Sequence, residues 1–170
     1  IHGYYACISF VDDQIGRLVL KLKELDLYND AIIVFVGDHG WQLGEHNLWA
    51  KHCNFQTSLK VPLLIKCTNQ TETKRIKSVV ELVDIFPTLC DISNLDYPIH
   101  WQGKSLTSVN KKDNSNTIGF STYKKGTTIT TSNDSYTRWQ NENNELWGQM
   151  LFDLKRDKDE NISRAIDSTD

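Results

Sequence analysis

Apolar residues recur at steps of three and four near the start of the chain, which is typical of an amphipathic helix. The apolar positions are Ile8, Val11, Ile15, Leu18, Leu22 and Leu25. After a turn at Asn29-Asp30, the unbroken run Ala31-Ile-Ile-Val-Phe-Val36 has the character of a strand covered on both sides. A helix, a short turn and a buried strand in succession predict a doubly wound α/β sheet.

The middle of the chain continues this arrangement after an irregular stretch. Residues 37–59 show little periodicity, and we interpret them as a long functional loop. Val61-Pro-Leu-Leu-Ile65 predicts a second strand and residues 79–83 a further one. Asp84 is then expected to cap a helix that runs to about Ile92.

The composition shifts near Ser108 towards Asn, Ser, Thr and Lys. Short β-like pieces follow at residues 117–123, 126–131 and 135–140, with a hairpin connection at 141–145. We therefore expect two parts: residues 1–107 as α/β sheet and residues 108–170 as a small antiparallel subdomain.

Composition excludes several classes of protein. A net charge of −3 gives no reason to expect nucleic acid as a partner. No apolar run reaches the ~20 residues that would span a bilayer, so we expect no membrane insertion. Because the chain opens at Ile1 inside a helical pattern, we expect the natural N-terminus to lie upstream.

The four cysteines show no CxxC pair, which argues against a zinc knuckle or a redox motif. Cys7 and Cys90 lie in apolar helical patterns and are predicted to be small core residues. Glycosylation sequons at Asn69, Asn133 and Asn161 permit a secretory route.

The strand at 31–36 leads directly into the residues most capable of chemistry. Gly37-Asp38-His39-Gly40 follows it, then Gly44-Glu45-His46 and Trp49-Ala50-Lys51. In open α/β sheets, ligands bind beyond the carboxyl ends of the strands. A carboxylate, an imidazole and an ammonium group at that edge are the set expected around a metal ion and an oxyanion.

Each of these residues also has a plainer interpretation. Asp38 is either a metal ligand or a turn-forming cap, and His39 is a ligand, a general acid or a donor to a sulfate or phosphate oxygen. Lys51 at about 4 Å from an anion would contribute roughly 4 kcal/mol at an effective dielectric near 20, although most lysines are surface charges. Trp41 and Trp49 either contact a ligand or pack the loop.

These segments resemble the sulfatase family of the alkaline phosphatase superfamily, and most of all its iduronate-2-sulfatase branch. The resemblance rests first on Val36-Gly-Asp-His-Gly-Trp-Gln-Leu-Gly-Glu-His46 followed by Trp49-Ala-Lys51. Glu81-Leu-Val-Asp-Ile-Phe-Pro-Thr-Leu89 and Leu151-Phe-Asp-Leu154 resemble later segments of that family in the same order.

The resemblance implies the C-terminal part of an alkaline-phosphatase-like α/β fold and a calcium-dependent hydrolase of sulfate esters. It implies that Asp38 and His39 bind the metal, and that Lys51, together with His39, is catalytic. Lys51 would contact the sulfate and assist the leaving group, with Trp41 and His46 as further substrate contacts. The implied substrate is a sulfated carbohydrate such as a glycosaminoglycan, and the implied location is lysosomal, secreted or periplasmic.

The chain departs from the family pattern in three places. None of its cysteines lies in the Cys-x-Pro-x-Arg motif that yields the formylglycine nucleophile, and the N-terminal Asp-Asp metal pair is missing. Thr130 stands where related sequences tend to carry arginine. We therefore expect the chain to need an N-terminal half to complete its sheet and site, and to be inactive alone. The alternatives are a non-catalytic remnant or binding fragment, or a phosphodiesterase-type member of the superfamily.

Overall fold

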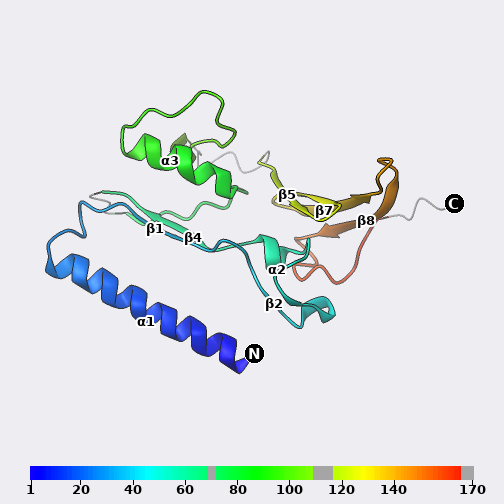
Figure 1. The fold of residues 1–170 in the computed structure, drawn as a ribbon, viewed down its shortest axis with the longest axis horizontal. Coiled ribbons are helices and arrows are strands. Elements are labelled where there is room, and N and C mark those ends of the chain that lie inside the picture. Colours follow the sequence, from blue (N-terminus) through cyan, green and yellow to red (C-terminus); the bar gives the residue numbers. More distant parts are fainter. Residues whose placement is uncertain (69–71, 109–116, 166–170) are drawn as a thin grey trace. The chain divides into compact units, whose positions relative to one another are not determined.

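The computed structural model describes residues 1–68, 72–108 and 117–165 (Figure 1). It divides into two compact units, each described by itself here. The first unit comprises Ile1–Asp38 and Val61–Lys74, and the second comprises His39–Lys60 and Arg75–Asp170. The sequon at Asn69 lies outside the described residues.

The first unit contains one long helix and a pair of strands. Helix α1 (His2–Glu24) confirms the predicted amphipathic helix. Strands β1 (Ile33–Val36) and β4 (Leu63–Lys66) pair antiparallel, with Ile33 opposite Lys66 and Val36 opposite Leu63. Both strands fall where the apolar runs predicted them.

The apolar side chains of the first unit are more exposed than their pattern predicted. Helix α1 has no buried residue, and Cys7, predicted to be a core residue, is exposed. Strand β1 was predicted to be covered on both sides, but Phe35 is 40% exposed. The physical reason is that, among the residues the structure describes, the strand has one neighbour, β4. A surface this apolar is typical of an interaction face.

The second unit is organised around a four-stranded antiparallel sheet in the order β5-β6-β7-β8 (Figure 1). Its strands are β5 (Gly119–Tyr123), β6 (Gly126–Thr130), β7 (Asp134–Gln140) and β8 (Leu146–Asp153). The predicted β-like pieces are therefore confirmed as one small antiparallel sheet.

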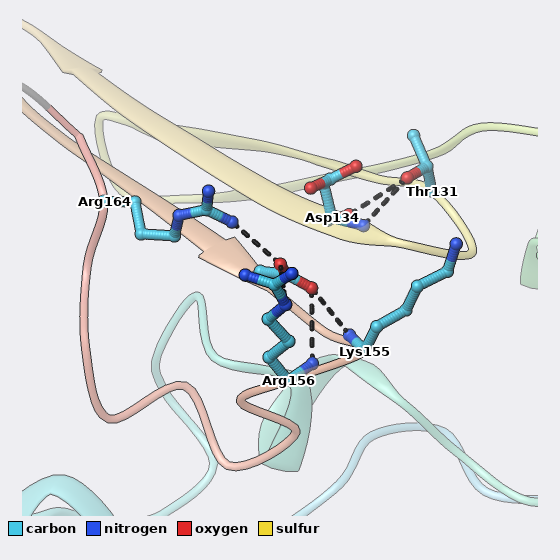
Figure 2. Close-up of polar contacts among 6 residues, drawn as sticks. Thr131, Asp134, Lys155, Arg156 and Arg164 are labelled. Atoms are coloured by element: carbon cyan, nitrogen blue, oxygen red, sulfur yellow. Dashed lines mark hydrogen bonds and ion pairs between the residues drawn. The ribbon is translucent and has the colours of Figure 1, made fainter.

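The turns of this sheet are closed by short side-chain hydrogen bonds (Figure 2). The backbone N–H of Asp134 donates to Thr131 Oγ1 at 2.9 Å, which fixes the β6–β7 connection. At the end of β8, Asp153 accepts hydrogen bonds from the backbone of Lys155 and from the Arg164 guanidinium, the latter at 2.8 Å. Asn133 and Asn161 lie in such connections, as predicted for sequons.

A helical segment precedes the sheet in the chain. The predicted strand at residues 79–83 is wrong: residues Leu82–Asp84 form a 3₁₀ turn, η2. A reciprocal capping box explains the difference, because Glu81 N–H donates to the Asp84 carboxylate at 2.9 Å. Helix α3 (Ile85–Ile92) follows and confirms the predicted helix, with Cys90 buried as expected.

The interior of the second unit is largely polar. Gln42, Asn54, Thr128, Thr137 and Glu160 are all at most 5% exposed. Thr128 Oγ1 lies 2.9 Å from Thr137 Oγ1, and Asn54 Nδ2 donates to Thr128 Oγ1 at 3.0 Å. Because buried polar groups are costly unless they are paired, these contacts hold residues 39–60 against the sheet.

Candidate functional site

The structure brings two of the predicted site residues together. Lys51 Nζ lies 3.0 Å from His39 Nε2, and His39 Nδ1 lies 2.8 Å from the Gly40 carbonyl oxygen. A carbonyl oxygen accepts and an ammonium group donates. Both contacts are therefore satisfied by a neutral imidazole that carries its proton on Nδ1. In this arrangement the Lys51 ammonium group donates a hydrogen bond to the Nε2 lone pair of His39.

A short hairpin explains how residues 12 positions apart meet. Strands β2 (Gln42–Leu43) and β3 (Trp49–Ala50) pair antiparallel, with Gln42 opposite Ala50 and Leu43 opposite Trp49. One step further along this ladder sets position 51 beside position 41. The hairpin therefore returns the lysine to the segment that carries His39.

The tip of the hairpin has an unusual backbone. The φ angles of Gly44, His46, Asn47 and Ala50 are 120°, 54°, 57° and 69°. Such left-handed conformations cost free energy and persist where the surroundings enforce them. One enforcing contact is the Leu43 N–H, which donates to the Glu45 carboxylate. This hydrogen bond is the main reason that the pKa of Glu45 is lowered.

The other arm of the hairpin is anchored to helix α2 (Gln56–Leu59). Gly40 N–H donates to the Ser58 carbonyl at 2.8 Å, and a Cβ at position 40 would lie 2.0 Å from the Thr57 carbonyl oxygen. Glycine is therefore required after His39 by the close approach of another backbone. Gln42 is 1% exposed and donates to Thr57 Oγ1.

Sequence reasoning missed these anchoring residues. Gln42 has the polarity of a loop residue, and nothing in its sequence neighbourhood indicates that Cys53 and Thr57 will surround it. The one signal in the sequence is the glycine after His39, a residue type that also suits a turn. Its structural role is to let the backbone of helix α2 approach closely.

The remaining predicted residues lie in different surroundings. The Trp41 ring lies 6.1 Å from the His39 ring at an interplanar angle of 28°, and it is 39% exposed. The His46 ring stacks on Phe55 at 3.8 Å, so the hairpin tip carries it to a separate aromatic contact. Asp38 is exposed and directly precedes His39 in the chain, as the last residue of the segment Ile1–Asp38 of the first unit.

Asp38 and His39 are the residues of this chain expected to bind a metal ion. Within residues 1–68, 72–108 and 117–165, no group of three or more His, Cys, Asp or Glu side chains is placed to hold a metal. Calcium takes about 6–8 oxygen ligands, whereas Asp38 and His39 offer one carboxylate and one imidazole. These two residues do not form a complete site, and calcium stays a prediction.

Comparisons with known proteins agree with the predicted fold class and family resemblance. The family model described as Sulfatase matches residues 1–95. A sulfatase from Formosa agariphila is 36% identical over 127 residues, which are 74% of this chain and 25% of that protein. Human iduronate 2-sulfatase is 35% identical over 121 residues, covering 56% of this chain and 22% of that protein. The chain thus spans about a quarter of the length of these relatives.

Solved structures confirm the fold. A candidate sulfatase from Bacteroides fragilis superposes with a TM-score of 0.83 at 26% identity, covering 96% of this chain and 37% of that one. Phosphonate monoester hydrolase from Agrobacterium radiobacter superposes with a TM-score of 0.80 at 24% identity, covering 97% of this chain and 37% of that one. The second similarity bears on the fold alone.

Proposed function

Because this chain belongs to the sulfatase family, we propose that it supplies the lysine and histidine of a site that hydrolyses sulfate esters. The observation that carries this proposal is the 3.0 Å contact between Lys51 Nζ and His39 Nε2, in the segment that follows Asp38 directly. The rest of the site, including the formylglycine nucleophile, is expected from the part of a sulfatase that this chain does not span.

Lys51 is proposed to act on the sulfate group itself. Hydrolysis breaks the bond between sulfur and the leaving oxygen, and negative charge grows on that oxygen as the bond lengthens. An ammonium group has three N–H donors, of which the contact with His39 uses one. The other two N–H donors suffice to contact one sulfate oxygen and the leaving oxygen. A positioned charge lowers the barrier most at these atoms, where negative charge develops.

His39 and Asp38 are proposed as this chain's contribution to a metal site. The Nδ1 proton of His39 is held by the Gly40 carbonyl at 2.8 Å, which fixes the tautomer whose Nε2 carries the lone pair that a metal would take. Lys51 Nζ lies 3.0 Å from that atom, so metal binding would require the ammonium group to release it and would leave all three of its N–H donors for the sulfate. A bound divalent ion would withdraw charge from the sulfate oxygens. The ion is proposed to be calcium, with its further ligands outside this chain.

The proposed substrate is a sulfated carbohydrate, such as a sulfated uronic acid unit of a glycosaminoglycan. The 35% identity with iduronate 2-sulfatase supports this choice. Trp41, exposed beside His39, is suited to contact a sugar ring. His46 stays a prediction as a substrate contact, since its ring lies on Phe55.

The proposed location is lysosomal or secreted, or periplasmic in a bacterium. The sequons at Asn133 and Asn161 support a secretory route, because both lie in loops of the second unit, outside its helices and strands. Among the described helices, none combines the length and apolar character needed to cross a bilayer.

The test is the activity of Lys51→Ala in the full-length enzyme that carries this chain. Removing one charge that stabilises the transition state typically costs about 10²–10³-fold in kcat, and we expect a loss of that order on a sulfated disaccharide. Lys155→Ala, which removes an exposed lysine at the turn after β8, is the matched control. Near-normal activity of Lys51→Ala would remove Lys51 from the site.

Two other functions are separated by simple measurements. An assay on phenylphosphonate esters beside aryl sulfates tests the phosphodiesterase-type alternative. Faster turnover of the phosphonate would favour the phosphodiesterase-type alternative. An upstream sequence without Cys-x-Pro-x-Arg would favour a non-catalytic binding fragment.

A further inference from the structure

A groove lies in the second unit between residues 48–55 and the four-stranded sheet. Its volume is about 510 Å³, within the range of roughly 300–1,000 Å³ that is usual for ligand pockets. Aromatic rings make up much of its lining, and two lysines stand beside them: the six residues used below are His52, Tyr123, Lys124, Lys125, Trp139 and Trp147.

The indole of Trp139 lies between two glycines. In the register of the sheet, Trp139 is opposite Gly126 on one side and Gly148 on the other. A Cβ at position 126 would lie 2.5 Å from Trp139 Nε1, and one at position 148 would lie 3.8 Å from its Cε3. Because neither neighbour has a side chain, the indole spreads over both backbones as a flat platform.

A second aromatic pair and a cluster of cations flank this platform. His52 stacks on Tyr123 with ring centroids 5.5 Å apart, and Lys124 Nζ lies 5.4 Å from the centre of the Tyr123 ring. Trp147 is 75% exposed, although an indole usually gains free energy from burial. Lys125 makes an exposed ion pair with Glu142, which is worth little and is easily exchanged for another anion.

The groove adjoins the proposed catalytic residues along the chain. His52, which belongs to its lining, follows Lys51 directly, and Leu48, also in the lining, precedes strand β3 of the hairpin. The groove and Lys51 therefore belong to the same unit, and one continuous stretch of chain, residues 48–55, carries both Lys51 and part of the groove lining.

We propose that this groove binds the sugar unit next to the one whose sulfate is hydrolysed, and that this unit is itself anionic. The proposal rests on the function proposed above and specifies the substrate as an oligosaccharide. The C–H faces of a pyranose ring are apolar and pack on flat aromatic rings such as Trp139 and Trp147. A carboxylate or sulfate on the same unit is complementary to Lys124 and Lys125.

The kinetic test compares two substrates in the full-length enzyme. Trp147→Ala should lower kcat/KM on a sulfated tetrasaccharide by about tenfold, the effect of losing one aromatic contact. The same variant should leave kcat/KM on a small aryl sulfate, which does not reach the groove, within about twofold of wild type. Lys124→Ala should behave in the same way, and Lys155→Ala should change neither value. Equal losses on both substrates, or no loss on either, would overturn the proposal.

A binding measurement separates this proposal from the function it rests on. We expect a sulfated disaccharide to change the tryptophan fluorescence of the wild type saturably, and Trp147→Ala to weaken that binding about tenfold. If the enzyme does not hydrolyse the aryl sulfate but does bind the disaccharide in this way, the proposed sulfatase function is wrong and the proposal that the groove binds an anionic sugar is supported. Two results would overturn the proposal for the groove. One is equally strong binding of an unsulfated, neutral oligosaccharide, and the other is a Trp147 that the protein's own chain shields from quenching by acrylamide.

Discussion

Glu160 offers the sharpest prediction, because this carboxyl group is buried without a full set of partners. It is 3% exposed, and one oxygen accepts a hydrogen bond from Gln56 N–H at 2.6 Å. Its other oxygen, Oε1, has no hydrogen bond to any described residue, and neither has Ser135 Oγ. Burial raises the pKa of Glu160, while the Gln56 N–H, nearby Ser135 and His46 lower it in part and Asp157 raises it further.

The direction of the pH effect follows from this raised pKa. The native state holds a proton on Glu160 more tightly than the unfolded state, whose pKa is close to 4.5. Below about pH 4.5 Glu160 is protonated in both states, so its burial as a charge does not lower the free energy of unfolding. The native state loses stability as pH rises through the higher native pKa. Above that pKa the penalty is constant.

Glu160→Gln removes the charge and keeps the shape. The glutamine oxygen can still accept from Gln56 N–H, and its amide group can donate towards Ser135 Oγ. Since an unsatisfied buried polar group costs about 1–3 kcal/mol, and more when charged, we expect the variant to be more stable by at least about 1 kcal/mol at pH 7.5. The difference should shrink towards zero near pH 4, where the wild type is protonated.

The assay is urea unfolding followed by tryptophan fluorescence at several pH values between 4 and 8. The matched control is Glu142→Gln, whose side chain is 89% exposed and whose ion pair with Lys125 should contribute little. A Glu160→Gln variant that is less stable at pH 7.5, or whose advantage does not change with pH, would refute the reasoning.

Two further substitutions test how residues 39–60 are held in place. Asn54→Ala removes the hydrogen bonds from this buried amide to the Gly126 carbonyl and Thr128 Oγ1, so urea titration should show a loss of about 1–3 kcal/mol. An unchanged unfolding midpoint would contradict the role of these contacts in holding residues 39–60 against the sheet. Gly40→Ala should lower both stability and activity, because its Cβ would lie 2.0 Å from a carbonyl oxygen. Its control, Gly16→Ala in the open interior of α1, should instead stabilise by about 0.5–1 kcal/mol, and equal effects of the two changes would refute the role of Gly40.

Periodicity in the sequence predicted the elements that are long enough to show it. Helix α1, strands β1 and β4 and strands β5 to β7 lie where apolar steps or β-like runs predicted them, and β8 follows the connection predicted at residues 141–145. The turn at Leu82–Asp84 was mistaken for a strand because its apolar residues are consecutive. The hydrogen bond between Glu81 N–H and the Asp84 carboxylate, three residues apart, stabilises a helical turn there instead of a strand.

The site shows a different limit of sequence reasoning. His39 and Lys51 were predicted as partners by resemblance, but the hairpin that joins them has strands of two residues, too short for any period to appear. The burial of Gln42 depends on its contacts with Cys53 and with Thr57 of α2, which are 11 and 15 residues away in the chain. Such contacts are set by the three-dimensional packing, which local pattern does not encode.

The central claim is that Lys51 holds the sulfate group, and its most direct test is a crystal structure of the full-length enzyme with a sulfated ligand or inorganic sulfate in the active site. The account predicts a sulfate oxygen within about 3 Å of Lys51 Nζ, as expected for a charge-assisted hydrogen bond. A sulfate bound in the site while the Lys51 ammonium group points into solvent would contradict it.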